Sequence, residues 1–201
     1  MFTTARATAI ALPVVLVFTL SGCSLLDASG DAGELTGTAA CALGHTWELD
    51  VTDLADQVKI QLGIQGVVVQ NVVGAGSQTL DWDVMGHVAM DTDYSFTITT
   101  APAADQVLTV VETHAGEVKG AAYINGDVAI PRKWDAGGLE ITVTADNNGT
   151  DVPTDELTYV IPTTDIDDSV GLELTCNGGA LTIHPRGGKI TLAFTKADQA
   201  G

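Results

Sequence analysis

The sequence predicts an all-β, antiparallel fold, a barrel or a sandwich, with one short helix near its start. Apolar residues alternate with polar ones in many short segments, which is the period of a half-buried strand. Clusters of glycine, asparagine, aspartate and proline separate these segments and are typical of turns. Helical segments are too few to connect parallel strands, which argues against a parallel α/β fold.

The clearest strands lie near the C-terminus. Apolar side chains alternate over residues 172–176, 181–183 and 190–194. An Asn-Gly-Gly turn at 177–179 separates the first two segments, and a turn at 185–188 separates the second from the third. The pattern predicts a three-stranded meander.

The middle of the chain shows the same alternation. We expect a turn at residues 113–116, a hairpin at Asn125-Gly126 and another at 146–149. The strands expected around these turns cover residues 94–98, 107–111, 118–124, 139–143 and 157–161.

One segment fits two structures. Thr52 and Asp53 are good N-cap residues, and the apolar residues after them are spaced as on one face of a helix, which favours a helix over 53–63. Apolar residues at every second position over 58–64 leave a strand as the alternative. A valine-rich strand at 67–73 is expected next.

The N-terminus has the features of an export signal. Arg6 precedes an apolar run over 7–20 that is short for a membrane span and typical of a signal-peptide core. The run ends in Leu20-Ser21-Gly22-Cys23, which resembles the lipobox of bacterial lipoproteins. The resemblance implies cleavage after residue 22 and a lipid anchor on Cys23 at the extracytoplasmic face of the cell membrane. An uncleaved signal anchor with a chance cysteine is the alternative.

A flexible tether is expected after the anchor. Residues 23–40 are rich in small and polar residues and contain no aromatic residue, so they bury little apolar surface. The folded domain should then cover residues 41–197.

The two remaining cysteines are candidates for a disulfide. If Cys23 carries lipid, Cys41 and Cys176 are left, and export places them where disulfides persist. A bridge between them would join the predicted first strand to one near the end of the domain. Two buried thiols are the alternative.

Charge and motifs exclude several functions. The 201-residue chain has a net charge of -18, which argues against nucleic acid and against a basic membrane-binding patch. No nucleophile elbow, phosphate loop or dinucleotide motif is present, and the histidines lack zinc-site spacing. The acidic loop at 146–151 lacks the ligand spacing of a calcium loop. We therefore predict no catalytic residue, no metal site, no cofactor and no enzymatic activity.

Both ends of the predicted domain resemble a family. The opening Cys-Ala-Leu-Gly-His-Thr-Trp at 41–47 and the hairpin Leu-Thr-Cys-Asn-Gly-Gly-Ala-Leu-Thr at 174–182 resemble those of lipocalin-like lipoproteins of actinobacteria. One extra residue lies between Gly44 and Trp47, and Gly179 stands where the family often has aspartate. The resemblance implies an up-and-down, lipocalin-like β-barrel with one short helix after the first strand.

The tryptophans have different expected roles. In such a barrel Trp47 would close one end of the core, whereas Trp82 and Trp134 are candidates for lining a ligand site. We expect a membrane-anchored, extracytoplasmic binding domain for a small apolar ligand or a cell-envelope component. The alternatives are a structural or interaction lipoprotein with a filled barrel, an envelope hydrolase with a dispersed site, and a cation-dependent adhesion protein.

Overall fold

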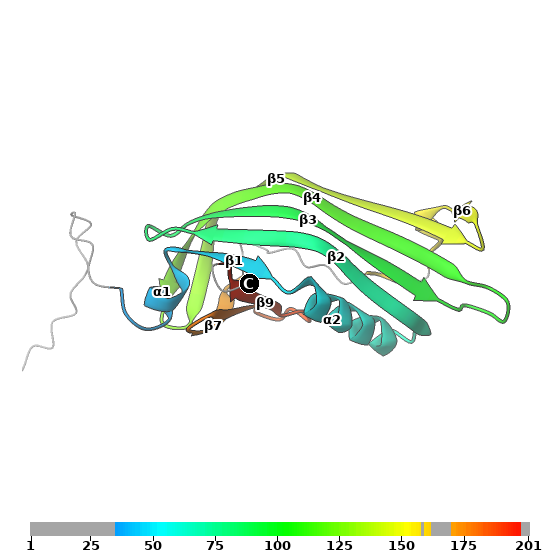
Figure 1. Cartoon of the computed structure of the whole chain (residues 1–201), viewed down its shortest axis with the longest axis horizontal. Helices are drawn as coiled ribbons and strands as arrows, with labels where there is room; N and C mark the ends of the chain where they lie inside the picture. The colour runs from blue at the N-terminus through cyan, green and yellow to red at the C-terminus, as the bar shows by residue number, and fades with distance from the viewer. Residues whose placement is uncertain (1–34, 158, 162–169, 198–201) are drawn as a thin grey trace, which may run out of the picture. The chain divides into compact units, whose positions relative to one another are not determined.

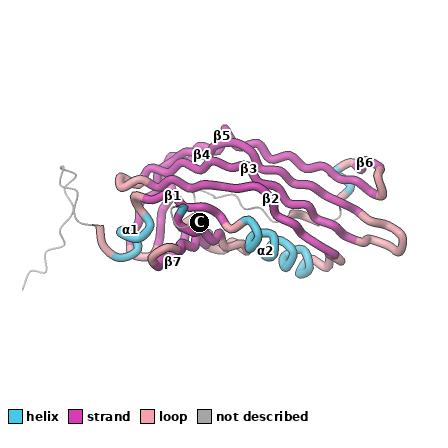
Figure 2. The backbone as a smooth tube through the Cα atoms, viewed as in Figure 1, coloured by secondary structure: helices cyan, strands magenta, loops and turns pink. Residues whose placement is uncertain are grey.

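A computed structural model describes residues 35–157, 159–161 and 170–197 (Figure 1). Strands dominate the described chain, as Figure 2 shows. Two α-helices and a 3-10 turn accompany them. The elements in chain order are α1 (Gly37–Ala42), β1 (His45–Leu49), α2 (Val51–Ile64), β2 (Val69–Trp82), β3 (His87–Thr100), β4 (Leu108–Asn125), β5 (Val128–Asn147), β6 (Thr150–Val152), η1 (Thr154–Glu156), β7 (Leu172–Asn177), β8 (Ala180–Pro185) and β9 (Leu192–Lys196).

Eight of these strands close into an up-and-down antiparallel barrel. Strands β1 to β5 pair each with the next, β5 pairs with β7, and the C-terminal meander β7–β8–β9 returns to β1. Strand β6 pairs only with the end of β5. The predicted fold class is confirmed, and the barrel replaces the sandwich as the arrangement.

The expected hairpins form where glycine and asparagine supply the turns. Asn125 and Val128 are paired, and Gly126 between them has a φ of 60°. Asn147 and Thr150 enclose a turn in which Asn148 has a φ of 52°. Positive φ values suit these two residue types, which is why such pairs predict hairpins well.

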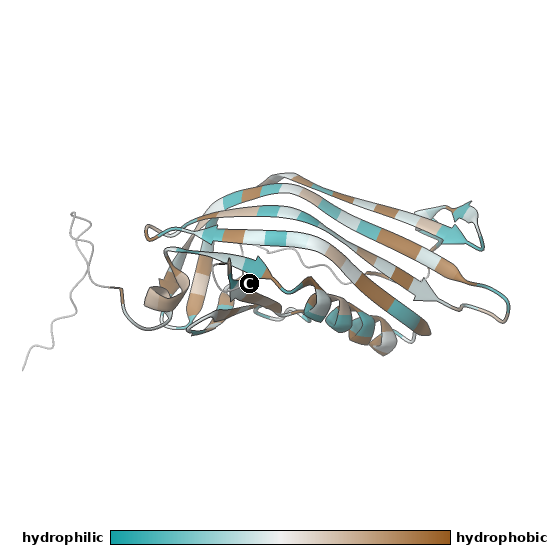
Figure 3. Cartoon of the chain, in the orientation of Figure 1, coloured by the Kyte–Doolittle hydropathy of each residue, from teal (hydrophilic) through white to brown (hydrophobic). Residues whose placement is uncertain are grey.

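Alternation places the apolar side chains inside the barrel. Figure 3 shows apolar and polar positions alternating along the long strands. All the alternating apolar residues predicted for the C-terminal meander are buried in the core, except Cys176, which is half-buried. The largest fully buried side chains are Trp47, Phe96, Phe194, Leu54, Leu62, Leu80, Ile98, Leu181 and Ile183.

The strands differ greatly in length. Strands β2 to β5 have 14 to 20 residues, whereas β1 and β7 to β9 have 5 or 6. Strands β5 and β7 share two residue pairs, Val128 with Glu173 and Ala129 with Leu172. The long strands therefore extend beyond the short ones, and α2 packs against β2 in this region (Figure 1).

The helix predicted over 53–63 is confirmed and begins two residues earlier. The N-cap is Asp50, whose carboxylate accepts hydrogen bonds from the backbone N–H groups of Thr52 and Asp53 at 3.0 and 2.9 Å. The strand alternative for this segment is wrong. Its extra apolar residues Ile60 and Ile64 are 61% and 70% exposed, and the helix buries Leu54, Ala55, Val58 and Leu62 instead.

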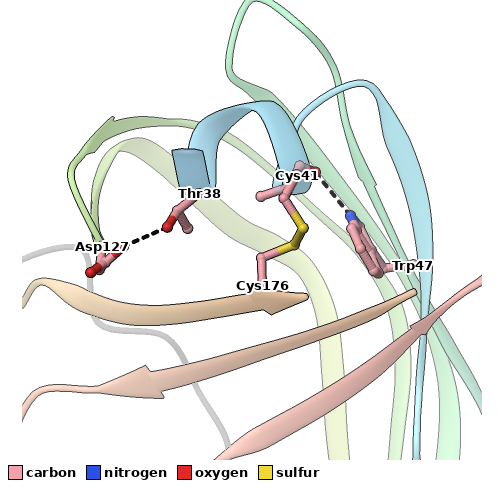
Figure 4. Close-up of a disulfide and its surroundings, with 6 residues drawn as sticks. Thr38, Cys41, Trp47, Asp127 and Cys176 are labelled. Atoms are coloured by element: carbon pink, nitrogen blue, oxygen red, sulfur yellow. Dashed lines mark hydrogen bonds between the residues drawn. A yellow bond between two sulfur atoms is a disulfide. The ribbon is translucent and has the colours of Figure 1, made fainter. Parts of the chain in front are cut away.

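A disulfide joins α1 to β7. Cys41 and Cys176 are bonded, with their Cα atoms 5.9 Å apart (Figure 4). Cys41 lies in α1 and not on the first strand, and this helix begins at Gly37, within the predicted tether. Beside the disulfide, the indole Nε1–H of the fully buried Trp47 donates to the carbonyl of Ala42 at 2.9 Å. Trp47 is thus a core residue, and its closing of one end of the barrel stays a prediction.

Two expected features of the middle region are wrong. Residues 113–116 form no turn, because β4 continues through them from Leu108 to Asn125. Residues 157 and 159–161 form no strand and follow the 3-10 turn η1. Alternation alone cannot tell a paired strand from an extended segment that packs without strand partners.

The N-terminal predictions lie outside the described residues. These are the signal peptide at 1–22, the lipidated Cys23 and the tether up to residue 34. Among the residues that are described, no helix has both the length and the apolar character needed to cross a bilayer.

Candidate functional site

A group of polar side chains is buried inside the barrel. We call these residues the polar patch: Gln78 on β2, Thr92 and Tyr94 on β3, and Glu112 and His114 on β4. They are neighbours across three strands, because Gln78 pairs with Thr92 and Tyr94 pairs with His114 in the strand register. Buried polar groups are costly unless they are satisfied, so five of them at one level of an apolar barrel suggest a site.

Two glycines let the wall bend beside the polar patch. Gly76 pairs with Tyr94 and has a φ of 94°, and a Cβ there would lie 2.2 Å from the carbonyl oxygen of Asp93. Gly116 has a φ of 122°, and a Cβ there would lie 2.0 Å from the carbonyl oxygen of Gly138. No other residue type fits these positions, and glycines of this kind allow a sheet to curve.

Glu112 and His114 form the centre of the polar patch. The His114 Nε2 and Glu112 Oε1 atoms are 2.6 Å apart, and the two residues are 2% and 6% exposed. Consecutive inward positions on β4 bring them together, since side chains at i and i+2 share one face of a strand. The second carboxylate oxygen of Glu112 is buried without a hydrogen-bond partner.

Aromatic rings hold the His114 side chain in place. The Tyr94 ring stacks on the imidazole with a centroid distance of 4.6 Å and an interplanar angle of 15°. Phe96 contacts the imidazole edge-on at 6.3 Å. The ring therefore has little freedom to turn away from Glu112.

Two hollows adjoin the polar patch, and His114 lines both. The first, the central cavity, has a volume of about 150 Å³, and the second, the side hollow, has about 410 Å³. The central cavity is lined by Gln78, Met90, Thr92, Tyr94, His114, Val118, Trp134, Ala136, Leu139 and Leu192. The side hollow is lined by Glu112, His114, Ile141, Val143, Thr154, Leu157, Tyr159 and Ile161.

The side hollow lies between the barrel wall and the segment that follows η1. Ile141 and Val143 on β5 line it together with Leu157 and Ile161, so most of the lining is apolar. Burial raises the pKa of Tyr159, which also lines the hollow, and the Thr100 hydroxyl partly offsets this effect. Tyr159 is therefore an uncharged phenol at neutral pH.

The predicted ligand-lining tryptophans lie together at a second, smaller space, and Trp134 alone also reaches the central cavity. Trp82 and Trp134 both line a space of only about 10 Å³, which has room for a single water molecule. Trp82 is buried in the core, whereas Trp134 is half-buried and also lines the central cavity. The role in ligand binding stays a prediction for both, and the geometry favours Trp134.

Glu112 and His114 were not predicted as site residues. The pattern predicted a turn at His114 and gave Glu112 no role. A usable signal was present, because Val110, Glu112, His114 and Val118 all occupy the same alternating face once the strand is continued through Gly116. Within the described parts of the chain, no group of three or more histidine, cysteine or acidic residues is arranged to hold a metal ion.

The fold and the polar patch define a closed antiparallel barrel with a partly polar interior. Comparison with known families found no family model that matches the chain, and comparison with curated proteins found no significant match.

Proposed function

We propose that this protein is a lipid-anchored, extracytoplasmic binding domain that holds a small, mainly apolar molecule in the side hollow. The observation that carries the proposal is the lining of this hollow. Its volume of about 410 Å³ lies within the usual range of small-molecule sites, and apolar side chains surround two buried polar groups, Glu112 and His114. A mainly apolar site with a few fixed polar groups is the usual composition of a specific ligand pocket.

The proposed location rests on the N-terminal sequence and on the disulfide. Leu20-Ser21-Gly22-Cys23 resembles a lipobox, and acyl chains on Cys23 would anchor the domain because each buried methylene adds about 0.8 kcal/mol. The bond between Cys41 and Cys176 agrees with an oxidising compartment outside the cytoplasm. The resemblance to lipocalin-like lipoproteins supports the same assignment. We propose no reaction for the site.

The anchor is tested by cell fractionation. The full chain should be found in the membrane fraction, and Cys23→Ala should move it to the soluble fraction. Unchanged membrane association of the variant would contradict lipidation at Cys23.

Ligand binding is tested with three small probes of the same shape: cyclohexylmethylamine, cyclohexylmethanol and cyclohexanecarboxylate. The full chain in neutral detergent micelles is titrated with each probe and binding is followed by NMR, with micelles lacking protein as the blank. At least one probe should bind saturably.

A matched pair of variants locates the binding. Ile141→Trp on β5 should fill the side hollow and weaken binding of that probe by about tenfold or more. Thr142→Trp, at the next and exposed position of the same strand, should leave binding unchanged. Saturable binding that Ile141→Trp leaves intact, or no saturable binding of any probe, would contradict the proposed function.

A further inference from the structure

One oxygen of Glu112 is available to a ligand. Its Oε1 atom accepts a hydrogen bond from His114, but its Oε2 atom is buried and has no partner. The residue is 6% exposed and lines the side hollow, so this oxygen is shielded from bulk water next to a space large enough for a small molecule.

An unpartnered carboxylate oxygen in such a place requires a donor. An ionised carboxylate only accepts hydrogen bonds, and leaving a buried acceptor unpaired is unfavourable, the more so when the group is charged. No lysine or arginine in the described chain forms an ion pair with Glu112. The ion pairs of Lys119 and Arg186 are with Glu117 and Glu173.

The charge of the whole protein favours a positively charged donor. The chain carries 26 acidic and 8 basic side chains, and the resulting net charge of -18 attracts cations and repels anions. A hydrogen bond between an ammonium group and a carboxylate is also about twice as strong as one between neutral groups. Tyr159 lines the same hollow, and an aromatic ring near a cation adds a favourable interaction.

We propose that the side hollow selects an organic cation, a primary or secondary amine on a small apolar body. The ammonium group donates to Oε2 of Glu112, and the apolar body packs against Ile141, Val143, Leu157 and Ile161. This inference rests on the proposed function and adds the chemical class of the ligand.

The same three probes test the selection by charge. Wild-type protein should bind cyclohexylmethylamine about tenfold or more tightly than cyclohexylmethanol, and cyclohexanecarboxylate should bind most weakly. Glu112→Gln keeps the shape of the side chain and removes its charge. The variant should therefore bind the amine no more tightly than the alcohol, and its affinity for the alcohol should stay within about threefold of the wild-type value. Glu140→Gln, on the exposed face of β5, should leave all three affinities unchanged.

The outcomes separate the two proposals. Equal affinity for amine and alcohol, tightest binding of the carboxylate, or an amine preference that survives Glu112→Gln would overturn the cation inference and leave the binding function standing. Absence of saturable binding for every probe would overturn both. The order of the three affinities on wild-type protein tests the cation inference even if Glu112→Gln fails to fold.

Discussion

Replacing both Cys41 and Cys176 by alanine removes the covalent link between α1 and β7. The link closes a loop with a sequence separation of 135 residues. In the folded state of the variant we expect Trp47 to keep its hydrogen bond to the carbonyl of Ala42 and the strands to keep their pairings, because neither depends on the sulfur atoms. The main effect is therefore expected in the unfolded chain, which gains freedom when the loop is open.

The magnitude follows from the length of the loop. The chain-entropy relation gives about 5 kcal/mol at 25 °C for a loop of this size, which is an upper value because the unfolded chain retains some structure. We expect the free energy of unfolding to fall by about 3–5 kcal/mol. Each kcal/mol shifts the Tm of a domain of this size by about 2–4 °C, so the Tm should fall by roughly 6–20 °C.

Urea unfolding of the full chain, monitored by tryptophan fluorescence, measures the change in the free energy of unfolding. Reduced wild-type protein should behave like the double variant, which separates the loss of the bond from the loss of two sulfur atoms. A difference of less than about 1 kcal/mol between oxidised protein and both other forms would refute the loop reasoning.

Three further predictions concern α2 and the turn between β2 and β3. Asp50→Ala removes the helix cap and should cost about 1 kcal/mol in urea unfolding, and no loss would argue against the cap. Leu54→Ala should cost about 2–5 kcal/mol, whereas the exposed Ile64→Ala should stay within about 0.5 kcal/mol, and similar losses would contradict the helix orientation. Desolvation raises the pKa of Asp83, but the hydrogen bonds from the His87 ring and from the backbone of Met85 and His87, with the charge of His87, together outweigh it and hold this pKa below its ordinary value of 3.8. The stability that this carboxylate adds is thus present above pH 3.8 and lost as pH falls through its folded pKa. Asp83→Asn should flatten that part of the acid dependence of the urea midpoint, and an unchanged slope would refute the assignment.

Sequence reasoning worked best where one face of a strand is apolar and the turns are short. The meander β7–β9 shows this, because its alternation and its glycine turns depend on neighbouring residues alone. The start of α2 was misplaced because Asp50, Thr52 and Asp53 are all good N-cap residues. Only the fold determines which of them carries the cap.

The candidate site could not be found in the same way. Glu112 and His114 occupy inward positions of β4 where alternation predicts apolar residues. The pattern therefore predicts a turn at 113–116, where the structure has a continuous strand that carries the polar patch. Local rules fail most often at functional positions, where a sequence gives up core packing for chemistry. The helix α1 was missed for another reason, since its six residues are held by Cys176 and by the burial of Ala42.

The ladder between β5 and β7 is short, and this should make it the first part of the barrel to open in solution. Strands β3 and β4 share 14 residue pairs, whereas β5 and β7 share two, so separating the latter breaks far fewer hydrogen bonds. Local opening should therefore begin there. The backbone amide of Leu174, which donates to the carbonyl of Asp127 beside this ladder at 2.8 Å, should exchange with solvent deuterium sooner than the amides in the middle of β3.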